Sequence, residues 1–538
     1  MLYWFRRITN AALRNGRRMN RMKVAMKLAG FHDYEIDIFH IWKLFFEHVE
    51  LADEHAPDAD FCMTLELARP DVETDAATAT LVRAGDHETW SHTEKRKLHG
   101  ASGDIRRREL KRLIGAALLR ALEDATGLKQ PWGVLTGVRP TKLMHNLMRR
   151  HSREESIRLL QEEYMLTDEK ANLLADVVQR QVEVIPDLYE LDREEVSLYI
   201  GIPFCPTKCA YCTFPAYDIR GNNGSVEAFL EGLHYEIRET GKWLKQAGLN
   251  ITTIYWGGGT PTSITAEQMD ALFVTIHESL PAMDKVRELT VEAGRPDTIT
   301  PEKLAVMKKW NVGRISINPQ SFTQQTLDKI GRHHSVEETV EKFWLSREWG
   351  MENINMDLII GLPNEGMTEF RHTLDEISRL LPESITVHTL SFKRASKMTK
   401  NRDSYEVAER SEVAEMMESA ISFMKEHGYH PYYLYRQKNI LGNLENVGYA
   451  LGERDSLYNI IMMEEVQTVI GLGCGAVSKV LFPAQVDEDG NEQRKIERFP
   501  NPKEPSVYNQ AYKEYVEKKL RLLDEAFGRA ACKEGSRA

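Results

Sequence analysis

Six short apolar runs alternate with helix-like segments between Val196 and Phe392. The runs are rich in β-branched residues and occupy 196–204, 252–260, 288–294, 313–321, 354–363 and 384–392. Continuous apolar runs of this length are typical of strands buried on both faces of a parallel sheet. Because parallel strands need right-handed helical crossovers, the pattern predicts a partial or full βα barrel or a doubly wound sheet.

Three of the intervening segments carry helix signals. Thr300 and Pro301 are suited to the N-cap and the first position of one helix. Apolar residues recur at helical spacing on one face of the other two. They are Val226, Phe229, Leu230, Leu233 and Ile237 in 225–244, and Phe370, Leu374, Ile377 and Leu381 in 367–381.

Polar residues or glycines stand at the carboxyl ends of five of the six runs. They are the cysteines of 205–212, then Gly257 to Thr260, Glu292, Gln320, and Gly361 with Pro363. The carboxyl ends of parallel strands share one edge, and active sites are built at that edge. The sequence therefore predicts a functional site there.

The flanking regions have different characters. Residues 1–192 mix strand and helix signals, including strands in 60–68 and 79–84 and a helix over 106–127, and predict an N-terminal α+β domain of unknown role. An acidic linker leads into the barrel, 193–396. The C-terminal domain, 397–538, is predicted to be helical and mixed. It holds a helix over 411–428, a loop-rich stretch over 429–455, a hydrophobic run over 466–482 and a helix over 506–527.

Composition excludes several classes of protein. The chain has 538 residues and a formal net charge of −11, which argues against a general nucleic-acid binder. It has no apolar run long enough to span a bilayer. Six cysteines in so long a chain do not form a disulfide framework, and three of them cluster, which predicts metal or redox chemistry in the cytoplasm.

The clustered cysteines form a CxxxCxxC triplet, Cys205, Cys209 and Cys212. Structural zinc normally takes four ligands in two separated pairs, and no second Cys or His pair stands at such a spacing. Three thiolates on a four-iron cluster leave one iron open for another ligand. The triplet favours an open iron–sulfur site over zinc or over three unligated cysteines.

The triplet, with Tyr211 before its last cysteine, matches the signature of radical S-adenosylmethionine (SAM) enzymes. YIGIPFCPTKCAYC, WGGGTPT, VEAGRPD, INPQSF and DLIIGLP resemble, in order, motifs of the oxygen-independent coproporphyrinogen III oxidase superfamily. The resemblance covers about residues 196–480, and the long N-terminal region is most similar to the HemZ (coproporphyrinogen dehydrogenase) branch. It implies a radical SAM partial (βα)6 TIM-like barrel.

The resemblance also implies roles for particular residues. Cys205, Cys209 and Cys212 would bind a 4Fe–4S cluster whose fourth iron takes the amino and carboxylate groups of SAM. Tyr199 and Arg332 are the implied catalytic residues. The implied SAM contacts are Tyr199, Tyr211, Gly258, Gly259, Thr260, Glu292, Gln320, Arg332, Asp357 and Val477. Taken singly, each is more often a turn, core or capping residue, so the prediction rests on their order.

The implied substrate is coproporphyrinogen III or a related tetrapyrrole. Two propionate arms would lose carbon dioxide and become vinyl groups, giving protoporphyrinogen IX. Lys393, Arg394 and Arg436 are candidates to bind the carboxylates, although a solvated charge explains each equally well. A low-potential electron donor such as flavodoxin or ferredoxin is the implied partner.

Two departures from the family pattern leave alternatives open. The best-characterised oxidases carry another cysteine where this chain has Phe214. Heme chaperones of the superfamily carry His-Asn-x-x-Tyr-Trp where this chain has Glu445 to Ala450, without the His and the Trp. A heme-binding chaperone, with Cys474, His427 or His430 as iron ligand, therefore remains an alternative, as does a radical SAM reaction on another tetrapyrrole.

Overall fold

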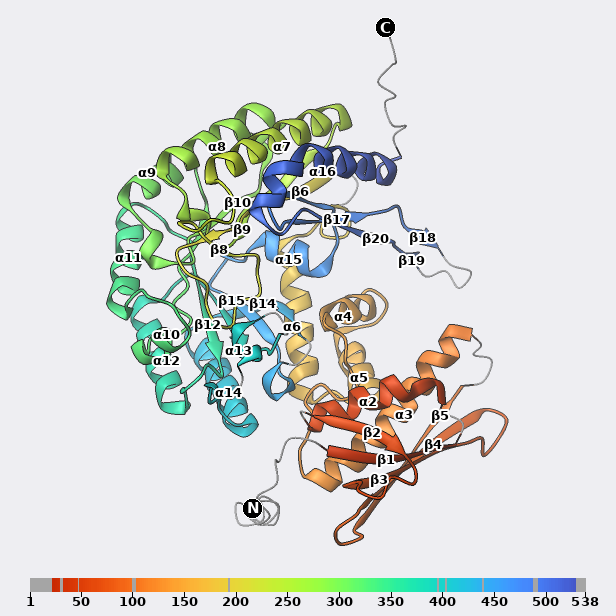
Figure 1. Cartoon of the computed structure of the whole chain (residues 1–538). Coiled ribbons are helices and arrows are strands. Elements are labelled where there is room, and N and C mark those ends of the chain that lie inside the picture. The colour runs from red at the N-terminus through yellow and green to blue at the C-terminus, as the bar shows by residue number, and fades with distance from the viewer. Residues whose placement is uncertain are drawn as a thin grey trace. The chain divides into compact units, whose positions relative to one another are not determined.

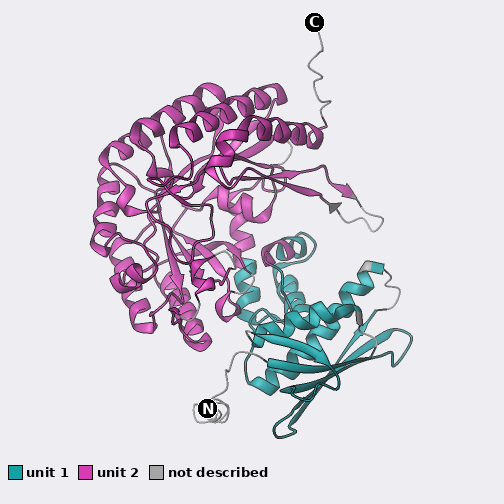
Figure 2. Ribbon diagram, in the orientation of Figure 1, with its two compact units in different colours: residues 1–137, 144–175 teal, residues 138–143, 176–538 magenta. Residues whose placement is uncertain are grey.

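The chain folds into two compact units, seen in Figures 1 and 2. One unit contains residues 1–137 and 144–175, and the other contains 138–143 and 176–538. The computed structural model describes residues 22–29, 32–46, 48–98, 103–191, 194–393, 396–401, 404–437, 440–486 and 492–528. Arg394 lies outside the described residues. The domain boundaries at 192 and 396 stay predictions.

The first unit is a five-stranded sheet with helices packed on it. Its strands stand in the order β2-β1-β3-β4-β5, and Trp42, Met63, Leu81, Leu113 and Leu118 are fully buried in its core. The predicted strands and helix are confirmed as β3, β4 and α3. The elements are β1 (Met22–Ala29), α2 (Glu35–Phe45), β2 (Val49–Asp53), β3 (Phe61–Ala68), β4 (Thr74–Arg83), β5 (Thr89–Lys97), α3 (Gly103–Thr126) and α5 (Arg153–Tyr164). Two further helices, α4 (Pro140–Met148) and α6 (Asp168–Val184), have residues in both units.

Six parallel strands form the centre of the second unit, which confirms the predicted α/β barrel class. They are β6 (Glu195–Ile202), β9 (Asn250–Gly258), β10 (Glu288–Glu292), β11 (Arg314–Ser316), β12 (Ile354–Ile360) and β13 (Ser384–Thr389). They neighbour one another in chain order. The helices between them lie along the outside of the sheet in Figure 1. These helices are α7 (Val226–Ala247), α8 (Ala266–Ser279), α9 (Pro301–Lys309), α10 (Gln324–Lys329), α11 (Val336–Glu348) and α12 (Met367–Leu380).

Later segments extend this sheet at both ends to eleven strands. Antiparallel β15 (Asn446–Ala450) and β14 (His430–Tyr435) follow β13, while β16 (Val469–Gly473) pairs in parallel with β6 and is followed by antiparallel β17 (Val477–Leu481) and β20 (Ile496–Pro500). Short pairs are formed by β7 (Phe204–Cys205) with β8 (Tyr217–Asp218), and by β18 (Gln485–Val486) with β19 (Glu492–Gln493). The remaining helices are α13 (Lys397–Lys400), α14 (Arg410–Glu426), α15 (Leu457–Glu464) and α16 (Pro505–Ala526).

Two expectations about local structure were wrong. The stretch 429–455 is not loop throughout, because β14 and β15 lie within it. Gly448 weakens the strand signal in the sequence, but the structure needs a glycine there. A Cβ on Gly448 would lie 1.8 Å from the Tyr433 ring. Leu381 is also not part of the apolar stripe of α12. It is exposed and caps the helix in a left-handed conformation, and Leu380 is buried instead.

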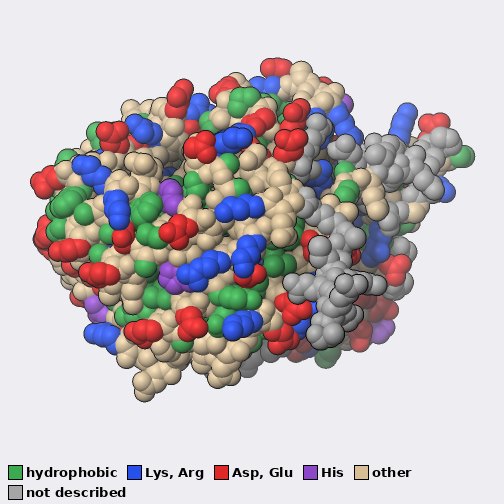
Figure 3. All heavy atoms as spheres, turned by 90° about the horizontal axis from the view of Figure 1, so that it is seen from above, with side chains coloured by type: hydrophobic (Ala, Val, Ile, Leu, Met, Phe, Trp, Pro, Cys, Tyr) green, Lys and Arg blue, Asp and Glu red, His purple; other side chains and the backbone are tan. Residues whose placement is uncertain are grey.

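No helix in the described part of the chain is long and apolar enough to cross a membrane. On the face drawn in Figure 3, acidic and basic side chains are intermingled.

A buried ion pair attaches the last helix to the barrel. Glu236 of α7 and Lys519 of α16 are both almost completely buried, and the Lys519 ammonium donates to the Glu236 carboxylate and to the carbonyl of Gly471, 2.5 Å away. The same carboxylate accepts from the Gly473 N–H at 2.7 Å and from the Tyr508 hydroxyl at 2.6 Å. Glu236 therefore joins two helices and the end of β16.

Removing one partner of this pair leaves the other charge buried and uncompensated. We expect Lys519→Met to lower the free energy of unfolding by about 3–5 kcal/mol, measured by urea denaturation. The neighbouring Lys518 pairs with Glu514 on the exposed side of α16. Lys518→Met is the matched control and should change stability by less than about 1 kcal/mol. Equal effects of the two substitutions would contradict the structural role of the pair.

Candidate functional site

The cysteine loop follows β6 and is tied down by backbone hydrogen bonds. Cys205 ends β7, and its carbonyl accepts from the N–H of Ile219 at 3.1 Å. Further along the loop, the Ala210 N–H donates to the Ile330 carbonyl at 2.8 Å, and the Ala210 carbonyl accepts from the Met398 N–H at 2.9 Å. The loop is thus fixed to the segments that end α10 and begin α13.

The three thiols of this loop are buried or half-buried, and none forms a disulfide. Burial raises the pKa of the Cys205 thiol to about 11, although the Thr260 hydroxyl, 3.3 Å from the sulfur, opposes the shift. Burial raises the pKa of Cys212 as well. Such thiols stay protonated at neutral pH until a metal centre displaces the proton.

The number of thiols on this loop suits a cluster. Among the described residues, no three His, Cys, Asp or Glu side chains lie close enough together to hold a single metal ion. In an iron–sulfur cluster each thiolate binds a different iron, so the ligands stand further apart than around one ion. Three thiols on one loop fit a four-iron cluster and leave one iron for another ligand.

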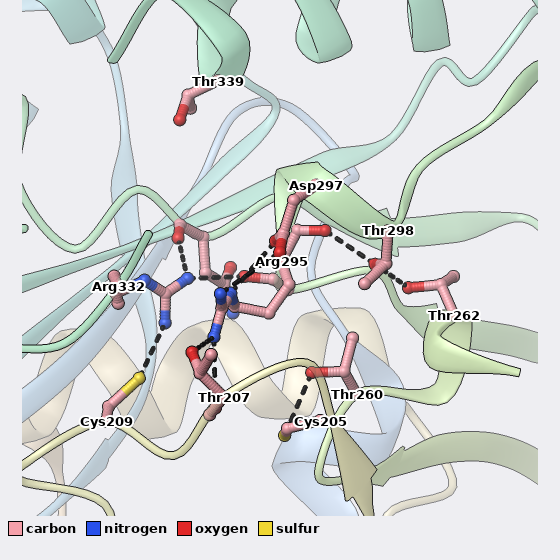
Figure 4. A network of polar contacts seen from close by, with 12 residues as sticks. Cys205, Thr207, Cys209, Thr260, Thr262, Arg295, Asp297, Thr298, Arg332 and Thr339 are labelled. Atoms are coloured by element: carbon pink, nitrogen blue, oxygen red, sulfur yellow. Dashed lines mark hydrogen bonds and ion pairs between the residues drawn. The ribbon is translucent and has the colours of Figure 1, made fainter. Parts of the chain in front are cut away.

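Arg332 faces the cysteine loop from beyond α10 (Figure 4). One guanidinium nitrogen, Nη2, donates to the carbonyls of Gly294 and Asn318 at 2.7 and 2.6 Å. The other, Nη1, lies 3.8 Å from the Cys209 sulfur and 3.4 Å from the Tyr211 hydroxyl. Arg332 is 5% exposed. A fixed cation beside Cys209 can offset the negative charge of a cluster-bound thiolate.

A second buried arginine, Arg295, holds the same loop at Thr207. Its Nη1 donates to the hydroxyl and the carbonyl of Thr207 at 3.0 and 3.2 Å, and its Nε and Nη2 pair with the Asp297 carboxylate (Figure 4). The Thr207 hydroxyl in turn donates to the Gly331 carbonyl. Sequence reasoning missed this residue, although VEAGRPD contains both Arg295 and Asp297.

The glycine turn after β9 packs directly against the start of the cysteine loop. A Cβ on Gly259 would lie 2.5 Å from the Phe204 carbonyl oxygen, and Gly258 has a φ of 111°. The Gly259 and Thr260 N–H groups donate to Ile202 and Phe204 at 2.8 and 2.7 Å. Glycine is needed here because two backbones approach more closely than a side chain allows.

Glu292, at the carboxyl end of β10, lies beside a stack of tyrosines. Its carboxylate accepts from the Tyr255 hydroxyl at 2.6 Å, and burial raises its pKa to about 7. The rings of Tyr199, Tyr255 and Tyr458 are nearly parallel, with centroids 4.3 to 6.3 Å apart. Tyr255 and Tyr458 were not predicted as site residues. The first precedes the glycine motif directly, and the second lies far along the chain in α15.

Gln320 and Asp357 meet at the next pair of strands. Gln320 has a left-handed φ of 68°, and its N–H donates to the Asp357 carbonyl at 2.9 Å. The Asp357 carboxylate accepts from the Asn355 amide at 2.8 Å and lies 3.7 Å from His388 Nε2. Burial alone would raise the pKa of Asp357, but His388 and Asn355 bring it below its usual value.

The structure thus gathers most of the predicted residues into three groups along one edge of the sheet. Val477 lies at the start of β17, where it pairs with Pro500. Burial lowers the pKa of Lys393, which Cys212 partly opposes, so the ammonium lies near the cysteine loop. Arg436 is buried, and its guanidinium donates to the Asn443 side chain at 2.6 Å.

Several known proteins are similar to this chain in sequence. A family model described as the radical SAM superfamily matches residues 199–377. Over 509 residues the chain is 52% identical to the oxygen-independent coproporphyrinogen-III oxidase-like protein HemZ of Bacillus subtilis (strain 168), with 93% of this chain and 98% of HemZ covered. The chain belongs to this HemZ family of radical SAM proteins. The resemblance inferred from the motifs is confirmed.

Two further likenesses are weaker. The heme chaperone HemW of Bacillus subtilis (strain 168) is 33% identical over 284 residues, which cover 52% of this chain and 70% of HemW. The solved structure of coproporphyrinogen III oxidase (HemN) from Escherichia coli is 20% identical, with a TM-score of 0.48, covering 63% of this chain and 73% of HemN.

The cofactors of this HemZ-family protein follow from its superfamily. Radical SAM proteins use a 4Fe–4S cluster and S-adenosylmethionine, and these are the cofactors of this chain. The reduced thiols at the carboxyl edge of the sheet fit the cluster. The assignment of individual SAM contacts stays a prediction.

Arg295 is expected to control how well the loop holds the cluster. We expect Arg295→Gln to lower cluster affinity by roughly 10-fold, because outer partners orient metal ligands. The measurement is iron and sulfide bound per chain after anaerobic reconstitution with limiting iron. Arg287, before β10, makes a similar paired bond to Asp187. Arg287→Gln is the control, and equal iron content in all three proteins would contradict the role of Arg295.

The raised pKa of Glu292 predicts that the stability of the chain depends on pH. Its pKa in the folded chain is about 7, above the ordinary 4.5, so between these values the folded chain holds a proton that the unfolded chain has lost. The stability contributed by this proton is therefore lost as pH rises from 4.5 to about 7, by roughly 3 kcal/mol in total. In Glu292→Gln this decline should be absent.

The measurement is the thermal unfolding midpoint of the chain without cluster or SAM at pH 5.5 and pH 7.5. Glu365, whose pKa is also raised to about 7, is present in both proteins and cancels. Tyr255→Phe removes a hydrogen bond that lowers the pKa of Glu292, so its decline should move to higher pH. The same pH profile in the parent chain and in Glu292→Gln would refute the assignment.

Proposed function

We propose that this protein is a radical SAM enzyme that converts two propionate arms of coproporphyrinogen III to vinyl groups, giving protoporphyrinogen IX. The observation that carries the proposal is the 52% identity to HemZ along nearly the full length of both chains. The cysteine loop supports it, because all three thiols, their two arginine partners and the glycine turn are in place.

The reaction is a one-carbon loss with a two-electron oxidation of each arm. When bound, the cluster and SAM supply a 5′-deoxyadenosyl radical that takes one hydrogen atom from the propionate β-carbon. The carboxylate carbon then leaves as carbon dioxide, one electron passes to an acceptor, and the former α- and β-carbons form the vinyl double bond. The protein must hold the reacting arm and exclude water while this happens.

We assign these tasks to residues of this chain according to where they lie. Arg332 and Arg295 fix the cysteine loop, while Glu292, Gln320 and Asp357 offer polar groups for the SAM amine, carboxylate and ribose. Gly258, Gly259 and Thr260 would border its methionine part, Tyr199 and Tyr211 would flank it, and Val477 would lie near adenine. Lys393, near Cys212, is the better candidate for a propionate carboxylate, since Arg436 already binds Asn443.

The alternative is heme binding and delivery, which the likeness to HemW favours over about half of this chain. The stretch Glu445 to Ala450, where that motif would need His and Trp, is fully buried in or beside β15. Cys474 donates to the Pro502 carbonyl, His427 stacks on Phe423, and His430 pairs with Asp455. These contacts favour the enzyme, because each of the three candidate heme ligands already contacts another residue of the described chain.

Two further parts of the proposal concern the surroundings of the enzyme. A low-potential donor such as flavodoxin or ferredoxin would reduce the cluster, since SAM cleavage needs one electron. The three thiols must stay reduced to bind iron, so we place the protein in the cytoplasm.

The test is an anaerobic assay of the reconstituted protein with SAM, dithionite and coproporphyrinogen III. We expect 5′-deoxyadenosine together with monovinyl and divinyl products, and loss of both in Cys205→Ala, Cys209→Ala and Cys212→Ala. Cys474→Ala is the control with an intact triplet. SAM cleavage without vinyl products would refute the oxidase, and saturable heme binding in that case would favour the chaperone.

A further inference from the structure

Four cationic side chains surround a single carboxylate, Glu465, just after α15. Lys142 Nζ lies 2.6 Å from Oε2, while Arg498 Nη2 and Lys479 Nζ lie 3.1 and 3.5 Å from Oε1. Arg139 Nη1 also donates to Oε1. The Glu465 side chain is 4% exposed, but those of Lys142 and Arg498 are 36% and 56% exposed. Lys142 and Arg498 therefore reach solvent, while the carboxylate does not.

The cluster carries a large excess of positive charge. In the described part of the chain, Glu465 is the one carboxylate within ion-pair distance of the four cations, so three positive charges are uncompensated. Burial and the charges of Arg139 and Arg498 lower the pKa of Lys479 to about 8. The carboxyl end of α15 adds only a partial negative charge, through the Met462 carbonyl that Lys479 contacts at 3.1 Å.

The start of helix α4 adds further positive potential and hydrogen-bond donors to the cluster. Arg139 directly precedes the nine-residue helix α4, and Lys142 lies in its first turn, where unpaired N–H groups and the helix dipole attract anions. Between them, Thr141 is fully buried, and its hydroxyl has no hydrogen-bond partner among the described residues. Glu465 has a left-handed φ of 51°, a conformation that a non-glycine residue adopts only when its surroundings impose it.

This cluster belongs to a different edge of the sheet from the cysteines. Lys479 pairs with Val469 at the start of β16 and with Arg498 on β20, and Val469 pairs with Ser197 near the start of β6. The cysteine loop follows the carboxyl end of β6. The reaction proposed above therefore leaves the cluster unused.

We propose that Arg139, Lys142, Lys479 and Arg498 form a binding site for a small multivalent anion of the phosphate class, such as pyrophosphate or a nucleotide phosphate. Two guanidinium forks, two ammonium groups and the start of a helix supply donors from several directions. A tetrahedral phosphate with two or more charges can accept from all of them, whereas a single carboxylate offers one plane of acceptors. Glu465 keeps the cations together when no anion is bound.

The test is anaerobic titration calorimetry of the full chain, reconstituted with its cluster, at about 0.15 M ionic strength. The probes are inorganic pyrophosphate, adenosine triphosphate and citrate. We expect saturable binding of a phosphate probe, and about tenfold weaker binding in Lys142→Gln and in Arg498→Gln. Lys495→Gln removes an exposed cation that pairs with Glu497 just before β20, and it should bind as the parent chain does.

Glu465→Gln separates an anion site from a merely structural cluster. It removes the competing negative charge, so it should bind the phosphate probe more tightly, even if the protein becomes less stable.

Tighter binding of adenosine triphosphate than pyrophosphate would mark a nucleotide as the source of the phosphate, and the reverse would mark the inorganic ion. No saturable binding to either probe, equal binding of citrate, or an equal loss in Lys495→Gln would overturn the proposal.

Discussion

Two buried guanidinium groups hold the cysteine loop, and the chemistry of the protein depends on that loop. Arg295 approaches it from the segment after β10 and Arg332 from the segment after α10, and each is bound to backbone carbonyls as well as to side chains. A buried charge is unfavourable unless it is hydrogen-bonded or paired, so these contacts fix each side chain in one position. The cation near Cys209 also offsets the negative charge that a ligated thiolate carries.

The loop itself is positioned mainly by backbone contacts. The glycine turn after β9 comes so close to Phe204 that no side chain fits between them, and its N–H groups donate to the ends of β6 and β7. Since both contacts involve the main chain, the distance between the first cysteine and the turn is set by the sheet. Side chains such as that of Thr260, whose hydroxyl lies 3.3 Å from the Cys205 sulfur, then contact a loop that the backbone has already fixed.

The two edges of the sheet differ in charge and in use. The carboxyl edge holds thiols, a protonatable Glu292 and a tyrosine stack, which suit a largely dry site for radical chemistry. The amino edge, near the start of β16, holds the four cations around Glu465. The C-terminal segment builds part of both, because β16 and β17 run between the edges, and the Glu236–Lys519 pair fixes α16 against them. The sequence after residue 396 is thus needed to complete the barrel unit.

The six strands and the cysteine triplet were readable from the sequence, because hydrophobic runs, helix caps and ligand spacing are local patterns. So were the motifs that place the chain in its family. The strands β14 and β15, the roles of Arg295, Tyr255 and Tyr458, and the cations around Glu465 were not. Their partners lie up to several hundred residues away, as with Arg139 and Glu465, and no local pattern records such a pairing. The sequence by itself determined which cofactors are used. Only the tertiary structure decided which charges meet, because burial and ion pairing depend on distance in space, not along the chain.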